Sequence, residues 1–176
     1  MTGQASLQLD QLSGPEALAL VEPLFREYGK WVAGRLLADL GRRFEEADLA
    51  RHHEGFRLEF PKLVGPRGRL LLARMGDDPV GVGALKPVDP ATAEIKRMYV
   101  KPSARGRGVG RALLERLVAD ARVEGYTIAR LESLCFMTEA HSLYRSLGFV
   151  DISMFDGCEA SLSGLEGLTY YMELTL

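Results

Sequence analysis

The sequence predicts a single α+β domain in which helices cover a mostly antiparallel sheet. Three observations carry this prediction. A turn signal at 76–79 separates two short apolar segments and indicates a hairpin. An amphipathic segment follows a glycine-rich turn at 105–110 and predicts a helix. The chain has 176 residues, no internal repeat and no linker, which fits one core that needs neither disulfides nor metals.

The first third of the chain predicts a strand and two helices. Residues 6–12 alternate weakly between apolar and polar side chains, as in a strand. Ser13 is expected to cap a helix that begins there, and a second helix is expected at 31–40, closed by Gly41. Residues 42–66 are charged, mixed and punctuated by glycine and proline, so they predict no definite element. Arg42, Arg43, Glu45 and Glu46 are expected to form a solvated face.

The rest of the chain predicts strands separated by two further helices. Period-two patterns predict strands at 69–74, 80–85, 93–100, 127–134, 149–152 and 169–176. Helical periodicity predicts helices at 107–124 and 138–147, which end at Gly125 and Gly148.

Composition and charge narrow the class of protein. The net charge of -2 creates no strong field to attract nucleic acid or anionic lipid, so neither is an expected partner. The first residues lack a signal-peptide pattern, and no apolar run approaches the roughly 20 residues of a membrane helix, so a cytoplasmic location is expected. Cys135 and Cys158 lack metal-ligand spacing, and the neighbouring His52 and His53 point in different directions. No metal site is predicted.

The most informative segment is Arg105-Gly106-Arg107-Gly108-Val109-Gly110, between a predicted strand and a predicted helix. Three alternating glycines allow a ligand to approach the backbone closely. Unpaired N–H groups at the start of the helix favour an anion, and Arg105, Arg107 and Arg111 add positive charge suited to phosphate. The segment therefore predicts a pyrophosphate cradle.

Two other phosphate-binding motifs fit this segment less well. A P-loop requires Lys followed by Ser or Thr after its last glycine, whereas Arg111 and Ala112 stand here. A dinucleotide-binding fold requires G-x-G-x-x-G directly after a strand and an acidic residue about 20 positions later. Glu132 stands near that position, but the glycines are spaced G-x-G-x-G and 101–104 separates them from the strand. The dinucleotide fold remains an alternative.

The chain resembles the GNAT acetyltransferase superfamily in two blocks. The family's strand, short loop and R/Q-x-x-G-x-G/A motif correspond to Met98-Tyr99-Val100, then 101–104, then 105–110. Residues 140–149, AHSLYRSLGF, are similar to the family's A-x-x-L-Y-x-x-x-G-F segment. The resemblance covers about 69–152 and thins out over 1–67.

The resemblance implies a GNAT-like mixed, mostly antiparallel central sheet flanked by helices, with acetyl-CoA as the acyl donor. Residues 1–67 would form the variable substrate side, 68–152 the acetyl-CoA-binding core, and 153–176 a loop and last strand of the one domain. The strand ending at Met98, Tyr99 and Val100 would splay from its neighbour and pair with the pantetheine arm. A backbone N–H near Met98 would polarise the thioester carbonyl. The N–H groups that would hold the pyrophosphate belong to Gly106, Arg107, Gly108, Val109, Gly110 and Arg111.

The resemblance also implies two side chains for proton transfer. Tyr144 matches a general acid that protonates the departing thiolate, with packing against the cofactor as its alternative role. Glu94 lies where some members place a catalytic carboxylate that deprotonates the amine, and its alternative role is a strand-edge charge. Met137 stands where many relatives have Asn, so a cofactor contact of that Asn would be absent. Cys135 is expected to be a buried, inert thiol.

The function implied is direct transfer of an acetyl group from acetyl-CoA to a primary amine in a ternary complex. The alternative is a non-catalytic acetyl-CoA-binding regulatory module. The acceptor would be a small-molecule or peptide amine, and a homodimer stays open. A set of acidic residues is expected to line the mouth of the site and favour a cationic amine over a free amino acid. These residues are Glu45, Glu46, Asp151, Asp156, Glu159 and Glu166.

Overall fold

The computed structural model describes residues 6–176, apart from the side chain of Leu162. Its strands are β1 (Leu7–Leu12), β2 (Arg69–Met75), β3 (Asp78–Pro87), β4 (Thr92–Val100), β5 (Ile128–Leu134), β6 (Val150–Ile152) and β7 (Thr169–Thr175). Its α-helices are α1 (Ala17–Leu40), α2 (Glu46–Leu63), α3 (Val109–Val123), α4 (Thr138–Ser146) and α5 (Ala160–Ser163). Short 3-10 turns, η1 (Pro102–Ala104) and η2 (Glu166–Leu168), precede α3 and β7.

The strands form one sheet in the order β1-β2-β3-β4-β5-β7-β6. All neighbouring strands are antiparallel except β4 and β5, which are parallel. The expected mixed, mostly antiparallel α+β architecture is therefore confirmed. None of the helices within 6–176 combines the length and the apolar character that a membrane crossing requires.

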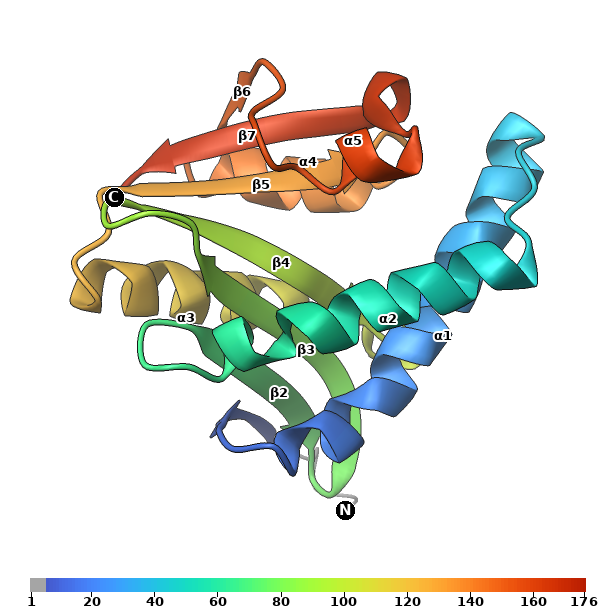
Figure 1. The fold of residues 1–176 in the computed structure, drawn as a ribbon. Coiled ribbons are helices and arrows are strands. Elements are labelled where there is room, and N and C mark those ends of the chain that lie inside the picture. The colour runs from blue at the N-terminus through green and yellow to red at the C-terminus, as the bar shows by residue number, and fades with distance from the viewer. Residues whose placement is uncertain (1–5) are drawn as a thin grey trace.

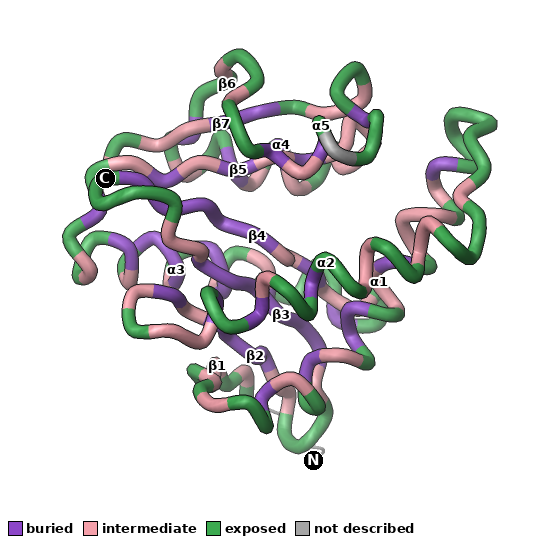
Figure 2. Tube along the Cα trace, in the orientation of Figure 1, coloured by how far each residue is buried: buried purple, intermediate pink, exposed green. Residues whose placement is uncertain are grey.

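Helices cover both faces of the sheet (Figure 1). On one face, α1 and α2 pack on β2, β3 and β4 through a cluster that includes Phe25, Phe56 and Leu63. On the other face, α3 and α4 contribute to a cluster that includes Leu113, Leu117 and Tyr144. Figure 2 shows that buried residues concentrate in the central strands, whereas the far ends of α1 and α2 are mainly exposed.

The parallel strands β4 and β5 separate after a short pairing. Their register covers Thr92 to Glu94 against Ile128 to Arg130 and stops there, although both strands continue. The two strands lie close together near the C-terminus and diverge away from it (Figure 1). The expected splay of the strand that ends at Val100 is therefore present, and it opens the sheet between β4 and β5.

A β-bulge in β4 lies at the point of divergence. Arg97 and Met98 oppose the single residue Gly83, because the register passes from Val82↔Tyr99 to Ala84↔Lys96. Arg97 has a φ of 57°, a left-handed conformation that costs a non-glycine residue about 1–3 kcal/mol. Because the bulge interrupts the alternation of β4, the consecutive residues Lys96 and Arg97 both reach the same carboxylate, that of Glu159.

Two expectations for the first third of the chain are wrong, and one segment without a predicted element is helical. The two predicted helices are one helix, α1, which continues through Pro23 and has Gly41 as its C-cap. The helix does not use Ser13 as its cap, because the N-cap is Glu16. The segment 42–66 is largely helical, since α2 buries three apolar side chains at helical spacing and has a capping box at its start. These side chains belong to Phe56, Phe60 and Leu63.

Candidate active site

The glycine-rich segment forms an open turn in front of α3. Gly106 and Gly108 have φ values of 72° and 81°, which side chains other than glycine rarely adopt. A Cβ atom at either position would meet nothing within 4 Å, so the space in front of the backbone is free for a ligand. Gly108 is the N-cap of α3 without a side-chain cap, and the first turn carries no acidic residue. The N–H groups at this helix start therefore suit an anion.

A pocket of about 270 Å³ lies over this turn. Val100 from β4 and Leu143 from α4 line it together with the turn itself. Among the residues predicted from sequence, the lining includes Val100, Arg105, Gly106, Gly108, Val109, Gly110 and Arg111. The structure thus brings most of the predicted cofactor residues to one place, and the free backbone space fits a pyrophosphate.

Arg105 is occupied by contacts within the protein. Its Nε donates to the carbonyl oxygen of Val100 at 3.1 Å, and its guanidinium lies 4.7 Å from the ring centroid of Trp31 on α1. Arg111 donates to Ser146 Oγ at 3.0 Å. Arg105 therefore joins the turn to β4 and α1.

The end of β4 presents its edge towards the divergence. Tyr99 is buried, and its hydroxyl donates to Glu27 at 2.8 Å. Burial, with this bond to Glu27, raises the pKa of Tyr99 above its usual value. Met98 and Val100 are partly buried against the core on the α3 side. Because β5 does not pair with this part of β4 in the described sheet, its backbone groups on that side are open to an extended ligand.

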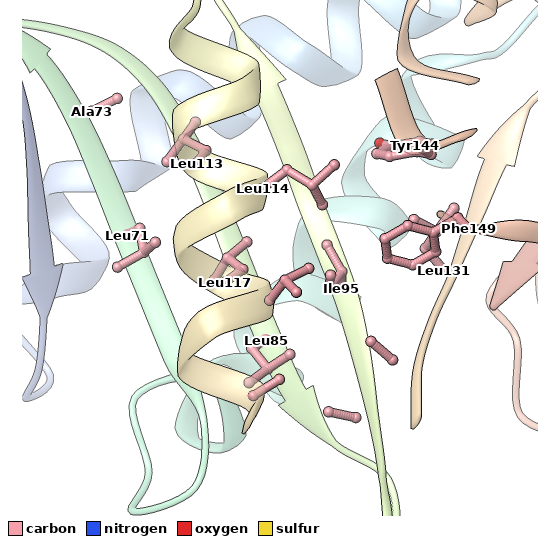
Figure 3. Close-up of a cluster of buried hydrophobic side chains, with 14 of the residues drawn as sticks. Leu71, Ala73, Leu85, Ile95, Leu113, Leu114, Leu117, Leu131, Tyr144 and Phe149 are labelled. Atoms are coloured by element: carbon pink, nitrogen blue, oxygen red, sulfur yellow. The ribbon is translucent and has the colours of Figure 1, made fainter. Parts of the chain in front are cut away.

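Tyr144 lies on α4 at the other side of the divergence. Its ring is buried with Phe149, 6.0 Å between centroids, and Figure 3 shows both rings beside Leu131, across the cluster from the leucines of α3. Burial raises the pKa of Tyr144 above its usual value of 10, so the phenol stays protonated at neutral pH.

A larger pocket of about 640 Å³ lies on the face of the sheet that α1 and α2 cover. Its charged lining comes from α2, β3, β4, β5 and the start of α5. These residues include His52, Glu59, Lys86, Lys96, Arg97, Glu132 and Glu159. The pocket therefore combines charges from segments more than 100 residues apart in sequence.

Ion pairs connect the charges of this pocket. Glu59 lies 3.0 Å from Lys86 and 3.1 Å from Arg97. Glu159 lies 3.3 Å from Lys96, 3.2 Å from Arg97 and 3.1 Å from His52 Nδ1. Burial alone would raise the pKa of Glu59 and of Glu159, but these neighbouring cations outweigh it and hold both values below 4.5.

Glu94 lies next to this pocket and pairs with two lysines that line it, Lys86 and Lys96. Its side chain is only 1% exposed, and its two oxygens lie 2.7 Å from Lys86 Nζ and 3.0 Å from Lys96 Nζ. Glu94 does not belong to the lining of the larger pocket. Its expected role as a base stays a prediction, and its position is neither solvent-exposed nor at the edge of the sheet.

Glu132 has fewer cationic neighbours than Glu59, Glu94 or Glu159. Its oxygens accept hydrogen bonds from the backbone N–H groups of Glu159 and Ala160, at 2.7 and 2.9 Å. Lys96 Nζ lies 3.7 Å away. Burial raises the pKa of Glu132 above 4.5, although Lys96 and the two backbone N–H groups act in the opposite direction.

Five of the six acidic residues that were expected to line the mouth of the site do not line the larger pocket. Among them, only Glu159 lines the larger pocket, where Lys96 and Arg97 neutralise it. Asp151 pairs with Arg145 at the surface, and Glu45 belongs to the capping box of α2. The remaining acids, Glu46, Asp156 and Glu166, are exposed and lie outside the lining.

His52 lines the larger pocket and pairs with Glu159. Its neighbour His53 has a lowered pKa because of burial. Among the described residues, no group of His, Cys, Asp or Glu is arranged to hold a metal ion. Cys135, expected to be a buried thiol, is only partly buried.

Sequence reasoning did not assign a pocket role to Glu59, Lys86, Lys96 or Glu132. A usable signal was present, since Glu94, Lys96 and Glu132 are charged residues inside predicted strands and Lys86 directly follows one. Such residues are rarely buried unless they are paired. The partner of each charge could not be read from the sequence because it lies on another element.

Comparisons with known proteins identify relatives of this chain. Residues 35–149 match the family model described as "Acetyltransferase (GNAT) family". The chain is 35% identical over 122 residues to IAA acetyltransferase of Azospirillum brasilense, covering 69% of the chain and 78% of that protein. It is 36% identical over 94 residues to the uncharacterized N-acetyltransferase YsnE of Bacillus subtilis, covering 52% and 62%.

Solved structures share the fold at low sequence identity. The PaiA N-acetyltransferase from Thermoplasma acidophilum in complex with coenzyme A has a TM-score of 0.72 and 20% identity, covering 97% of this chain and 99% of that one. A GNAT family acetyltransferase from Elizabethkingia anophelis with acetyl-CoA bound has a TM-score of 0.60 and 16% identity, covering 97% and 98%.

Proposed function

The chain belongs to the GNAT family of acetyltransferases and is an acetyl-CoA-dependent N-acetyltransferase that acts on an amine. From this premise we propose that its two pockets divide the reaction between them. The smaller pocket receives the acyl donor, and the larger pocket receives the amine. Their elements meet where β4 and β5 diverge, and this divergence is the observation that carries the proposal.

The donor side follows from the open backbone of the turn. The N–H groups from Gly106 to Arg111 bind the pyrophosphate, and the free edge of β4 at Met98, Tyr99 and Val100 pairs with the pantetheine arm. The positive φ of Gly106 and Gly108 and the absence of any atom within 4 Å of a Cβ there support this assignment. Acetyl-CoA, as the cosubstrate, supplies an activated acetyl thioester. A backbone N–H near Met98 donates to the thioester carbonyl oxygen, a contact worth about 3 kcal/mol.

Tyr144 donates a hydrogen bond to the departing sulfur. A phenol with an ordinary pKa of about 10 is a weaker acid than a thiol of about 8.5, so complete proton transfer to the thiolate is uphill by about 2 kcal/mol. Burial raises the pKa of Tyr144 further. Tyr144 therefore stabilises charge on the sulfur mainly as a neutral hydrogen-bond donor.

Glu94 is the base that the family resemblance implies. With both oxygens bound to lysine ammonium groups and 1% of its side chain exposed, it would reach an acceptor only through a neighbouring group. Its geometry is better suited to holding Lys86 and Lys96 in place.

The acceptor binds on the side formed by residues 1–67. Tyr28, His52 and Glu59 from this region line the larger pocket, and the core segment 68–152 contributes β3, β4 and β5. The segment 153–176 closes the pocket with Glu159 and Leu165. This distribution supports one domain whose variable first third determines the acceptor.

A panel of primary amines tests the proposed function. Free thiol should appear only when the purified chain, acetyl-CoA and an accepted amine are all present, and the amine should gain one acetyl group. Tight acetyl-CoA binding without thiol release on any amine would favour the non-catalytic binding module. Tight NAD binding without acetyl-CoA binding would favour the dinucleotide alternative.

A further inference from the structure

We propose that Glu132 binds the ammonium group of the acceptor and accepts its proton before the transfer. This assignment rests on the proposed function and deepens it. Glu132 lines the larger pocket from β5, and its side chain is 14% exposed. A solute in the pocket can therefore reach its carboxylate, unlike that of Glu94.

The alternation of β5 directs Glu132 into the pocket. Its neighbour Leu131 packs in the core on the α3 side of the sheet, and successive side chains of a strand point to opposite faces. Glu132 therefore faces the side that α1 and α2 cover. Lys96 and Arg97 line the same pocket from β4, so Glu132 stands opposite β4 at the divergence of the two strands.

Backbone hydrogen bonds hold the carboxylate in one orientation. The N–H groups of Glu159 and Ala160 donate to its two oxygens at 2.7 and 2.9 Å. These bonds orient Glu132 but add no formal positive charge. Each carboxylate oxygen can accept a second hydrogen bond, so an ammonium group can still bind.

The charge balance of the pocket leaves Glu132 as its least compensated carboxylate. Glu59, Glu94 and Glu159 each lie within 4 Å of at least two cationic groups. Among the described side chains, Glu132 has Lys96 alone within that distance, at 3.7 Å. With the Asp48–Arg51 pair that also lines the pocket, five carboxylates face four permanent cations, so an arriving ammonium group would balance the charge.

The same environment gives Glu132 the properties of a base. Its pKa lies above 4.5 because it is buried, whereas the cations around Glu59 and Glu159 hold their pKa values below 4.5. Among these three carboxylates, Glu132 therefore has the highest affinity for a proton. The titratable or charged groups that face it are Glu94 and Lys96 from β4, Glu159 from the segment before α5, Tyr171 from β7 and Tyr28 from α1.

Glu132 takes one proton from the ammonium group and releases it later to solvent. The nitrogen lone pair then forms a C–N bond with the thioester carbonyl carbon, and the C–S bond breaks with its electron pair on sulfur. The second proton lost from nitrogen is balanced by the proton gained at sulfur, where Tyr144 donates its hydrogen bond. The products are an N-substituted acetamide, a thiol and one released proton.

Two amines that differ in basicity test the proposal. Ethylamine is protonated at pH 7, whereas 2,2,2-trifluoroethylamine is largely neutral and needs no base to become a nucleophile. Glu132→Gln should lower kcat/KM for ethylamine about 100-fold at pH 7, within the range for loss of a general base. The loss for trifluoroethylamine should be only a few-fold. For the wild type, kcat/KM for ethylamine should fall with decreasing pH through a pKa above 4.5, and Glu132→Gln should lack this limb.

Two further variants act as controls. Glu173→Gln changes a carboxylate on β7 outside the larger pocket and should keep wild-type rates with both amines. Equal losses for both amines in Glu132→Gln would indicate a structural role and overturn the proposal, as would wild-type rates. A selective loss for ethylamine in Glu94→Gln, but not in Glu132→Gln, would assign the base to Glu94 instead.

A binding measurement decides the case in which neither small amine is acetylated. The protein is labelled with ¹³C at the side-chain carboxyl carbon of glutamate, and the signals of its CoA-bound form are followed by NMR. The signal of Glu132 is the one that is lost in Glu132→Gln. Addition of ethylammonium should shift this signal and lower its titration midpoint from a value above 4.5. An unchanged signal would overturn the proposal. The proposed function fails only if no amine of a broad panel is acetylated, so the two failures are distinguishable.

Discussion

Glu94 Oε2 lies 2.7 Å from Lys86 Nζ, and the glutamate side chain is 1% exposed. The carboxylate is therefore shielded from solvent, and its other oxygen is engaged by Lys96. This arrangement makes Glu94 a structural anchor for two lysines that line the larger pocket.

We predict that Glu94→Gln destabilises the protein more than it impairs chemistry. Removal of one partner of a buried ion pair leaves uncompensated charge and costs about 3–5 kcal/mol. Urea denaturation should report this loss in the free energy of unfolding, while folded Glu94→Gln retains most of its kcat. A variant with wild-type stability and strongly reduced kcat, most marked at low pH, would instead support the direct base role.

We predict that Gly108→Val abolishes acetyl-CoA binding. The new side chain would occupy the space in front of the turn, and valine is strained at a φ of 81°. Gly125→Val is a matched control, because Gly125 has a φ of 82°, also has nothing within 4 Å of a Cβ, and lies at the opposite end of α3. Calorimetric titration should show loss of affinity in the first variant alone. Equal affinities in two folded variants would contradict the cradle.

We predict that Tyr144→Phe lowers kcat about 100-fold with little change in the KM for acetyl-CoA, because it removes a contact made in the transition state. The pKa of Tyr144 lies above 10, so its protonated form persists and should cause no loss of wild-type activity up to about pH 9. Steady-state rates across pH 6 to about 9 check both statements. A variant with raised KM and unchanged kcat would assign Tyr144 to packing against the cofactor.

We predict that the enzyme prefers an amino acid amide or methyl ester over the free amino acid. The acidic residues expected at the mouth do not carry this preference. It follows from the pocket, where the cations are already paired with Glu59, Glu94 and Glu159 and cannot readily accept a further carboxylate. Comparison of kcat/KM for the matched pair checks it. Clear preference for the free acid would show that Arg97 or a lysine exchanges its partner for the substrate.

Local chemistry made the donor side predictable from sequence. Gly106, Gly108 and the following amphipathic helix are contiguous, so the turn and the helix start could be inferred together. The hairpin of β2 and β3 and the course of β4 were predictable for the same reason. Conversely, α2 was not predicted from the sequence. Its buried apolar side chains belong to Phe56, Phe60 and Leu63, and the charged residues between them give the segment the average composition of a loop.

The acceptor side depends on long-range contacts that no local pattern encodes. Glu159 and His52 are 107 positions apart in sequence but 3.1 Å apart in the structure. The bulge at Arg97 and Met98 places consecutive side chains towards the same partner, against the alternation that sequence analysis assumes. The partners of the charges in the larger pocket could be identified only after the sheet was assembled.

The most direct test of the central claim follows the acetyl group itself. The purified chain is mixed with acetyl-CoA that carries a ¹³C-labelled carbonyl and with an amine accepted in the panel, and the carbonyl signal is followed by NMR. We predict that the thioester signal is replaced by an amide signal of the acceptor, together with one equivalent of free thiol, and that Gly108→Val shows neither change. Persistence of the thioester with every amine of the panel, in a folded protein that binds acetyl-CoA, would contradict the account.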